Sequence, residues 1–148
     1  MSVRVQTADF DVAREIAALR AGDTGVGAVA TFIGTVRDMN DSARIDGMTL
    51  EHYPGMTEAA LAEIVAEARA RFDIRDALVI HRVGVLAPGD QIVLVAVTSA
   101  HRGMAFEACR YVMDLLKTRA PFWKKERTPS GERWVEARES DEKAAQRW

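Results

Sequence analysis

The segment Ile92-Val93-Leu94-Val95-Ala96-Val97 is a continuous apolar run that follows the turn-forming residues Ala87-Pro88-Gly89-Asp90. Its β-branched residues favour a strand. A strand with one face in water alternates apolar and polar residues, whereas a continuous apolar strand is covered on both faces. The run therefore predicts a sheet that lies between two other layers of the protein.

Helical and extended segments flank this strand in mixed order. Apolar residues spaced three or four apart predict helices, and alternating or β-branched runs predict strands. Residues 37–47 are polar and turn-forming, which predicts a mobile loop joining a hairpin of two strands. We expect strands at about 3–5, 28–36, 48–53, 78–86, 92–98 and 133–137, and helices at about 12–22, 57–72, 103–119 and 140–148. This order indicates an α+β protein with a largely antiparallel sheet.

The second and third expected helices each carry an apolar stripe that should face the core. Thr57 is expected to cap the second helix. The core positions expected on these two helices are Leu61, Ile64, Val65, Ala68 and Phe72, and then Phe106, Tyr111, Val112, Leu115 and Leu116.

The composition excludes several classes of protein. The chain has 148 residues, 48% hydrophobic and 28% charged, which fits one globular domain over residues 1–148. Its formal net charge of -2 argues against a general nucleic-acid binder, which is normally basic. The only cysteine, Cys109, lies among apolar neighbours, so we expect a buried thiol and a reducing compartment. No signal-peptide core or membrane-spanning stretch is present, which predicts a cytoplasmic protein without membrane association.

Four cations gather around a proline and two aromatic residues behind the third helix. Pro121 should end that helix near Arg119. Lys117 then lies on its last turn, and Lys124 and Lys125 lie on the segment that folds back. The helix dipole favours a single cation at this position, so one lysine needs no ligand. The group of four favours a pocket for an anion over a solvated helix end.

A second candidate anion site lies where the apolar strand leads into the third helix. His101 and Arg102 are adjacent there to unpaired backbone N–H groups, which attract anions, although a solvated turn is the alternative. About 25 Å of helix, at 1.5 Å per residue, separates Arg102 from Arg119. The two helix ends therefore predict either two anion sites or a homodimer that joins opposite ends in one pocket. Arg37, after the 28–36 strand, is a further cation for such a pocket.

The histidines do not suggest a metal centre. His52 and His81 lie inside predicted strands, which favours structural roles over ligation. The three histidines are scattered, with no cysteine or carboxylate at ligand spacing. We therefore expect no metal site and no cofactor.

Five blocks of sequence are informative together. They are Thr31-Phe32-Ile33-Gly34-Thr35-Val36-Arg37, Leu50-Glu51-His52-Tyr53-Pro54-Gly55-Met56, Val97-Thr98-Ser99-Ala100-His101-Arg102, Lys117-Thr118-Arg119-Ala120-Pro121-Phe122-Trp123-Lys124 and Arg133-Trp134-Val135-Glu136-Ala137. In this order they resemble the catalytic large subunit of molybdopterin synthase, and the resemblance covers nearly the whole chain. It implies an α/β-hammerhead-type fold with an additional antiparallel β-sheet.

The resemblance also implies a reaction and partners. In that family two sulfurs are inserted into cyclic pyranopterin monophosphate (precursor Z) to make the dithiolene of molybdopterin, in molybdenum cofactor biosynthesis. The sulfur arrives as a thiocarboxylate on the C-terminal Gly-Gly of a small ubiquitin-like subunit. The implied assembly is a homodimer flanked by two small subunits, which is a heterotetramer. The residues agree independently, because Cys109 is the only thiol and is expected to be buried.

The resemblance assigns roles position by position. Lys117 and Lys124 match the catalytic lysines of the family. The substrate-binding positions implied are Thr35 through its backbone, Val36, Arg37, His101, Arg102, Lys117, Lys124, Lys125 and Glu126, with Arg138 as a further cation near the substrate or the partner's tail.

These residue types suit sulfur transfer. A lysine that is partly desolvated and close to another cation has a lowered pKa and can act as a general acid or base. We expect Lys117 to mediate proton transfer or transient acyl capture, and Lys124 to position the anions. Residues 38–47 are expected to close over the substrate.

Two alternatives come from other classes of protein. A regulatory module would bind a phosphorylated metabolite at His101 and Arg102 without turnover. A structural adaptor would use Phe122, Trp123 and Trp148 as an exposed protein-binding patch. The joint pattern of lysine, arginine and histidine favours the enzyme over both.

Overall fold

The structure is a computed structural model that describes residues 2–136 and 138–148. The strands of its first sheet are β1 (Val3–Gln6), β6 (Asp76–Arg82), β8 (Gln91–Ser99) and β2 (Ala28–Thr35). They lie in the order β1-β6-β8-β2, with a parallel β1–β6 pair and antiparallel pairs elsewhere. The architecture is α+β with largely antiparallel sheets, as the order of the segments predicts.

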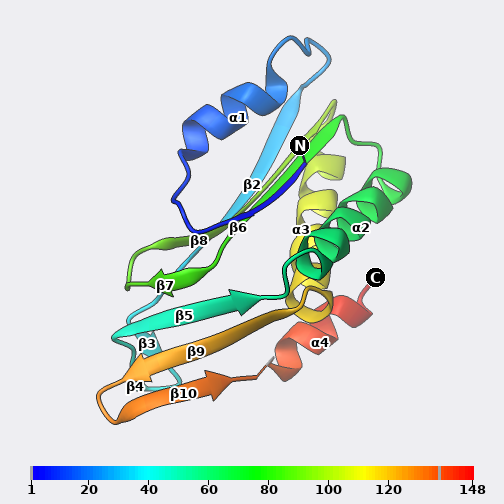
Figure 1. Ribbon diagram of the computed structural model, residues 1–148. Helices are drawn as coiled ribbons and strands as arrows, with labels where there is room; N and C mark the ends of the chain where they lie inside the picture. Colours follow the sequence, from blue (N-terminus) through cyan, green and yellow to red (C-terminus); the bar gives the residue numbers. More distant parts are fainter. Residues whose placement is uncertain (1, 137) are drawn as a thin grey trace.

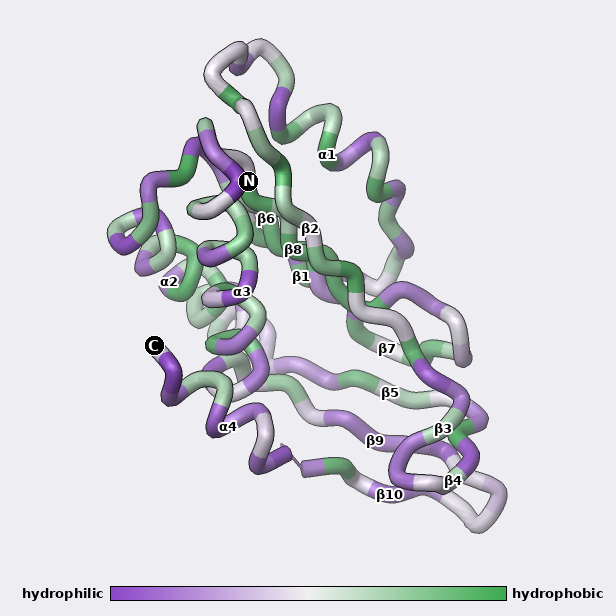
Figure 2. The backbone as a smooth tube through the Cα atoms, turned by 180° about the vertical axis from the view of Figure 1, so that it is seen from behind, coloured by the Kyte–Doolittle hydropathy of each residue, from purple (hydrophilic) through white to green (hydrophobic). Residues whose placement is uncertain are grey.

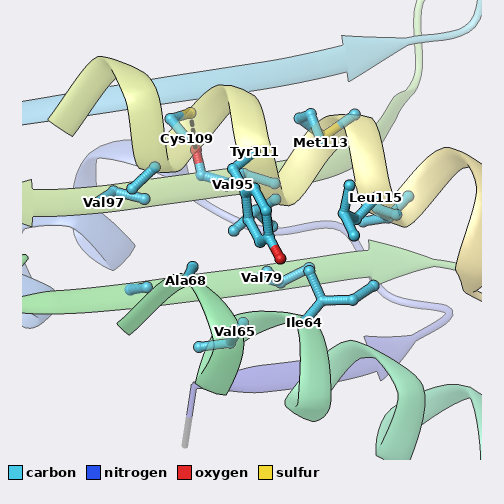
Figure 3. Packing of buried hydrophobic residues seen from close by; sticks show 14 of the residues in the cluster. Ile64, Val65, Ala68, Val79, Val95, Val97, Cys109, Tyr111, Met113 and Leu115 are labelled. Carbon is cyan, nitrogen blue, oxygen red and sulfur yellow. Dashed lines mark hydrogen bonds between the residues drawn. The ribbon is translucent and has the colours of Figure 1, made fainter. Parts of the chain in front are cut away.

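Helices cover both faces of this sheet (Figure 1). They are α1 (Val12–Arg20) on one face, and α2 (Met56–Arg71) and α3 (Arg102–Arg119) on the other. Along β8, Val93, Val95 and Val97 pack toward α2 and α3, whereas Leu94 and Ala96 pack toward α1. Figure 3 shows Val95 and Val97 against side chains of both helices. The prediction of a strand covered on both faces is confirmed.

A second sheet lies beside the first. Its strands are β10 (Gly131–Val135), β9 (Phe122–Thr128), β5 (Gly47–His52) and β7 (Gly84–Leu86), all antiparallel and in the order β10-β9-β5-β7. The expected hairpin between segments 28–36 and 48–53 is wrong, because β2 pairs with β8 and β5 pairs with β9 and β7. The expected strand over 78–86 is divided. Gly84, with φ of 93°, turns the chain out of β6 and into the second sheet.

The segment expected to be a mobile loop forms a small hairpin instead. It contains β3 (Met39–Asn40) and β4 (Ala43–Arg44). Asp41 and Ser42 have φ of 51° and 67°, as the central pair of a two-residue hairpin turn requires. Asn40 is buried, and its side-chain amide donates hydrogen bonds to Glu126 on β9. The hairpin is therefore docked on the second sheet.

The helices agree closely with their predicted positions. Ala120 caps the C-terminus of α3 just before Pro121, and the apolar stripe of α2 is buried. The prediction that Phe106 lies in the core is wrong, because this residue is 66% exposed. Gly55, not Thr57, is the N-cap residue of α2. Thr57 is fully buried and donates a hydrogen bond of 3.0 Å to the carbonyl of Pro121, which ties α2 to the proline corner.

The chain ends in α4 (Glu139–Gln146), close to the helix predicted from residue 140. The terminal Trp148 packs edge-on against Phe72 and Tyr111, and its indole N–H donates to Asp114 at 2.7 Å. Trp148 is therefore part of the packing of α3, which removes it from the adaptor patch. The strand predicted over 133–137 is present as β10, and Ala137 lies outside the described residues.

The hydrophobic positions are concentrated in the first sheet. Figure 2 shows this in β6 and β8, whereas β9 and α4 are largely hydrophilic. Within residues 2–136 and 138–148, no helix is both long and apolar enough to cross a membrane.

Candidate active site

A cavity of about 490 Å³ lies where α3 ends, between the second sheet and the docked hairpin. Three parts of the chain that are distant in sequence bring polar groups to it. Its polar and charged lining residues are Thr35, Arg37, Asn40, His81, Lys117, Lys124, Glu126, Glu136, Arg138, Ser140 and Asp141. Apolar residues, including Leu116 and Phe122, complete the wall.

Side chains along β9 alternate in direction, and this alternation determines which of its residues line the cavity. Successive side chains of a strand point to opposite faces, so Phe122, Lys124 and Glu126 share the face that lines it. Lys125 points to the other face, where its ammonium lies 3.6 Å from Glu132 and 4.6 Å from the ring centre of Trp134. The expectation that Lys125 borders the pocket does not fit this geometry.

Four cations face the cavity: Arg37, Lys117, Lys124 and Arg138. Burial lowers the pKa of Lys124, and the positive charges of Lys117, Arg138 and Arg37 lower it further, whereas Glu126 acts in the opposite direction. Lys124 therefore loses its proton more readily than a lysine in water, in a cavity whose four cations outnumber the three carboxylates of Glu126, Glu136 and Asp141.

Glu126 is held by a buried polar network. The side-chain amide of Asn40 donates to both carboxylate oxygens, at 3.0 and 2.8 Å, and Arg133 donates to one of them at 3.3 Å. The guanidinium of Arg138 donates in turn to the side-chain oxygen of Asn40. The network joins β9, the hairpin and the segment before α4, so it determines the shape of the cavity wall.

The other predicted site residues lie elsewhere. His101 is the N-cap residue of α3 and Arg102 is its first residue, and both are exposed at the helix end opposite Lys117. Neither lines the cavity of this chain. Val36 is buried, and its backbone N–H donates to the carbonyl of Asp90 at 2.9 Å, so it supports the position of Arg37. Thr35 lines the cavity.

Several cavity residues are absent from the site that the sequence predicts, and Asn40 and His81 are the two polar ones that are buried. Asn40 lies in residues 37–47, and the sequence of this segment indicates only that it is polar and turn-forming. His81, expected to be structural, is 5% exposed and burial lowers its pKa to about 4, but it also lines the cavity. Its place inside a strand favours a core role, and the sequence carries no signal for which face of β6 meets the second sheet.

No group of three metal-ligating side chains is found in the part of the chain that the structure describes. The thiol of Cys109 is buried and lies 3.9 Å from the carbonyl oxygen of Val95 (Figure 3). Burial raises its pKa to about 11. Cys109 is therefore a packed thiol that stays protonated at neutral pH, and it is poorly suited to act as a nucleophile.

The structure is an α+β protein with a polar cavity at the end of α3, lined by four cations and by the carboxylates of Glu126, Glu136 and Asp141. Comparison with known proteins identifies the family. The MoaE protein family matches residues 5–119. The molybdopterin synthase catalytic subunit of Ralstonia nicotianae is 65% identical, over 99% of this chain and 84% of that protein. The protein of the same description from Pseudomonas aeruginosa is 57% identical, over 100% of this chain and 99% of that protein.

Comparison with solved structures gives the same fold. The molybdopterin biosynthesis MoaE protein from Burkholderia ambifaria superposes with a TM-score of 0.86 at 56% identity, covering 99% of this chain and 97% of that chain. A complex of subunits 1 and 2 of the molybdopterin-converting factor from Helicobacter pylori includes a chain with the same fold, with a TM-score of 0.76 at 18% identity, covering 93% of this chain and 92% of that chain. The chain belongs to the MoaE family of molybdopterin synthase catalytic subunits, and the fold expected from the resemblance is confirmed.

Proposed function

We propose that this chain transfers two sulfurs to cyclic pyranopterin monophosphate, each from the C-terminal thiocarboxylate of a small ubiquitin-like subunit. For each sulfur, the bond between the small subunit's terminal carbonyl carbon and sulfur breaks. A carbon–oxygen bond of the pterin side chain is replaced by a carbon–sulfur bond, and its oxygen leaves on the opened cyclic phosphate or as water. Water supplies the oxygen that leaves the small subunit with a carboxylate. The observation that carries the proposal is a cavity with four cations, which suits a phosphorylated substrate and an anionic sulfur donor.

The sulfur must come from outside the chain. Cys109 is the only cysteine of the sequence, and it is buried with a raised pKa. A donor that arrives on a flexible C-terminal tail avoids the need for a thiolate within the cavity. The complex formed by subunits 1 and 2 of the Helicobacter pylori molybdopterin-converting factor is consistent with such a partner.

The two lysines have different roles in the proposal. The lowered pKa of Lys124 supports this residue as the proton carrier, because a general acid or base works best when its pKa is near the working pH. Lys117 then binds the substrate phosphate or the thiocarboxylate. This division is the reverse of the one expected from the sequence, which assigns proton transfer to Lys117.

A homodimer would account for His101 and Arg102. In this chain they lie at the end of α3 that is remote from the cavity, so a second copy would have to bring them there. Phe106 and Met104, near that end of α3, are 66% and 37% exposed. Apolar side chains in this position are suited to contact with another subunit. We propose that the partner's His101 and the partner's Arg102 complete the site.

The experiment is a reconstitution. The protein is mixed with a thiocarboxylated small subunit and cyclic pyranopterin monophosphate, and the dithiolene product is followed by mass spectrometry. Product formation is expected with the wild-type chain and should be reduced with Lys117→Ala, which removes a cation that holds the anions. Tight binding of the pterin with no product would contradict the enzyme and favour the regulatory module. Wild-type activity of Lys117→Ala would contradict the role of the cavity.

A further inference from the structure

His81 occupies the boundary between the two sheets. It lies on β6 of the first sheet, one residue before that strand ends, and lines the cavity that the second sheet encloses. Its side chain is almost entirely buried. An ionisable side chain in such a place needs a physical explanation.

The ring of His81 is held in one orientation. It stacks on Phe122 with ring centres 3.8 Å apart and an angle of 19° between the planes. Its Nδ1 lies 2.8 Å from the carbonyl oxygen of Arg82. A carbonyl oxygen only accepts hydrogen bonds, so Nδ1 carries the proton and Nε2 carries a lone pair in the neutral ring.

The neutral ring is the form that the surroundings favour. Burial lowers the pKa of His81 to about 4, and the nearby charges of Lys117 on α3 and His52 on β5 act in the same direction. The carbonyl of Arg82 opposes them without overcoming the burial. At neutral pH Nε2 is therefore a hydrogen-bond acceptor.

This acceptor is accessible from the cavity. Among the described residues, no group forms a hydrogen bond with Nε2. Every fully buried side-chain nitrogen or oxygen atom of these residues does have a hydrogen-bond partner, so Nε2 is not one of the fully buried atoms. Nε2 therefore has exposed surface, and the cavity is the open space that His81 lines. The cations of the cavity recognise negative charge, whereas a neutral acceptor recognises an N–H or O–H donor without cancelling that charge.

We propose that His81 is a further substrate-binding residue whose Nε2 accepts a hydrogen bond from a ring N–H of a phosphorylated nitrogen heterocycle. The inference rests on the proposed function and specifies how its site holds the substrate. The cations bind the phosphate, and His81 binds the heterocycle, so the two contacts together orient the substrate between Lys117 and Lys124. Phe122 acts as a positioning residue that keeps the imidazole ring in place.

The test compares two ligands and two variants by equilibrium binding. The ligands are cyclic pyranopterin monophosphate and inorganic phosphate. His81→Phe keeps an aromatic ring to stack on Phe122 but removes the acceptor, and His81→Gln keeps an acceptor near the position of Nε2. We expect His81→Phe to weaken pterin binding roughly tenfold, in line with the loss of one hydrogen bond, and to leave phosphate binding unchanged. His81→Gln should retain most of the pterin affinity.

The outcomes separate the inference from the proposed function. Equal losses for both ligands would assign His81 a structural role and overturn the inference, as would unchanged pterin binding by His81→Phe. A wild-type chain that binds phosphate but not the pterin would overturn both proposals. Nitrogen-15 NMR of the wild-type protein gives a readout that does not depend on a variant folding. The Nε2 signal should shift on addition of the pterin and not of phosphate, and an unmoved signal would contradict the contact.

Discussion

The two faces of β9 carry the same residue type and give it different chemistry. Lys124 and Lys125 are consecutive, yet Lys124 faces a cavity shared with three other cations, and Lys125 faces outward between Glu132 and Trp134. Burial and like charge lower the pKa of Lys124. The comparison teaches that the direction of a side chain from its strand, more than its place in a basic run, decides whether it can take part in catalysis.

The largest effect on the rate of sulfur transfer is expected at Lys124, and the neighbouring Lys125 serves as its control. Lys124→Ala should reduce the rate of dithiolene formation by about 10²–10⁴-fold, the range for loss of a general acid or base. Lys125→Ala should change it by less than about twofold, because it loses only an exposed ion pair. Product formation in the reconstituted system measures both. Similar losses for the two variants would break the comparison.

The pH dependence of the free energy of unfolding tests the environment of His81, which lines the cavity. The pKa of His81 is about 4 in the folded chain and about 6.5 when unfolded, so the neutral ring stabilises the fold fully above pH 6.5. This contribution is lost as the pH falls from 6.5 to 4, and amounts to on the order of 3 kcal/mol. Urea unfolding of the wild type should show the loss, and His81→Gln should show a flatter dependence. Identical pH dependence in the two proteins would contradict the buried neutral imidazole.

The carboxylates on the two faces give a smaller contrast. Glu126 has a side chain that is 3% exposed and bonded to Asn40 and Arg133, whereas Glu132 is 58% exposed. Glu126→Gln should lower the free energy of unfolding by about 2 kcal/mol, because charge-assisted hydrogen bonds are weakened inside the protein. Glu132→Gln should lower it by less than about 1 kcal/mol. Chemical denaturation monitored by circular dichroism measures both, and a larger loss for Glu132→Gln would reverse the assignment.

The smallest effect is expected at the thiol. Cys109→Ala should leave the rate of sulfur transfer unchanged, because a thiol with a pKa of about 11 takes no part in the chemistry at neutral pH. Its cost to stability should be about 1 kcal/mol, from the lost packing of the sulfur. The reconstituted assay and thermal unfolding provide the two readouts. Loss of activity in a fully folded variant would show that the chain uses its own sulfur.

Local patterns predict most of the elements but not their pairing. Both faces of β8 are apolar, so its sequence alone predicts that a layer of the protein covers each face. The break at Gly84, which sends β7 to the second sheet, depends on a backbone angle that no periodicity records. The same limit explains why the partner expected for β5 is wrong. Pairing between distant strands is decided by packing of the whole molecule.

The candidate site is also predictable only in part, because some of its residues come from segments that are distant in sequence. The proline corner and the end of α3 are adjacent in sequence, so Lys117 and Lys124 can be placed together from the chain alone. Lys125 is grouped with them when the extended segment after Pro121 is not recognised as a strand with two faces. Asn40 and His81 reach the cavity from remote segments, through the docked hairpin and the junction of the sheets. Only the tertiary structure brings these together.

Competitive labelling of the lysine amines tests the central claim most directly. The protein is treated with a trace of acetic anhydride, with and without cyclic pyranopterin monophosphate, and fragment-ion mass spectrometry resolves the two adjacent lysines. We expect the substrate to reduce the labelling of Lys124 strongly and to leave Lys125 unchanged. Protection of Lys125 alone, or equal labelling of Lys124 with and without the substrate, would contradict a substrate site on the inner face of β9.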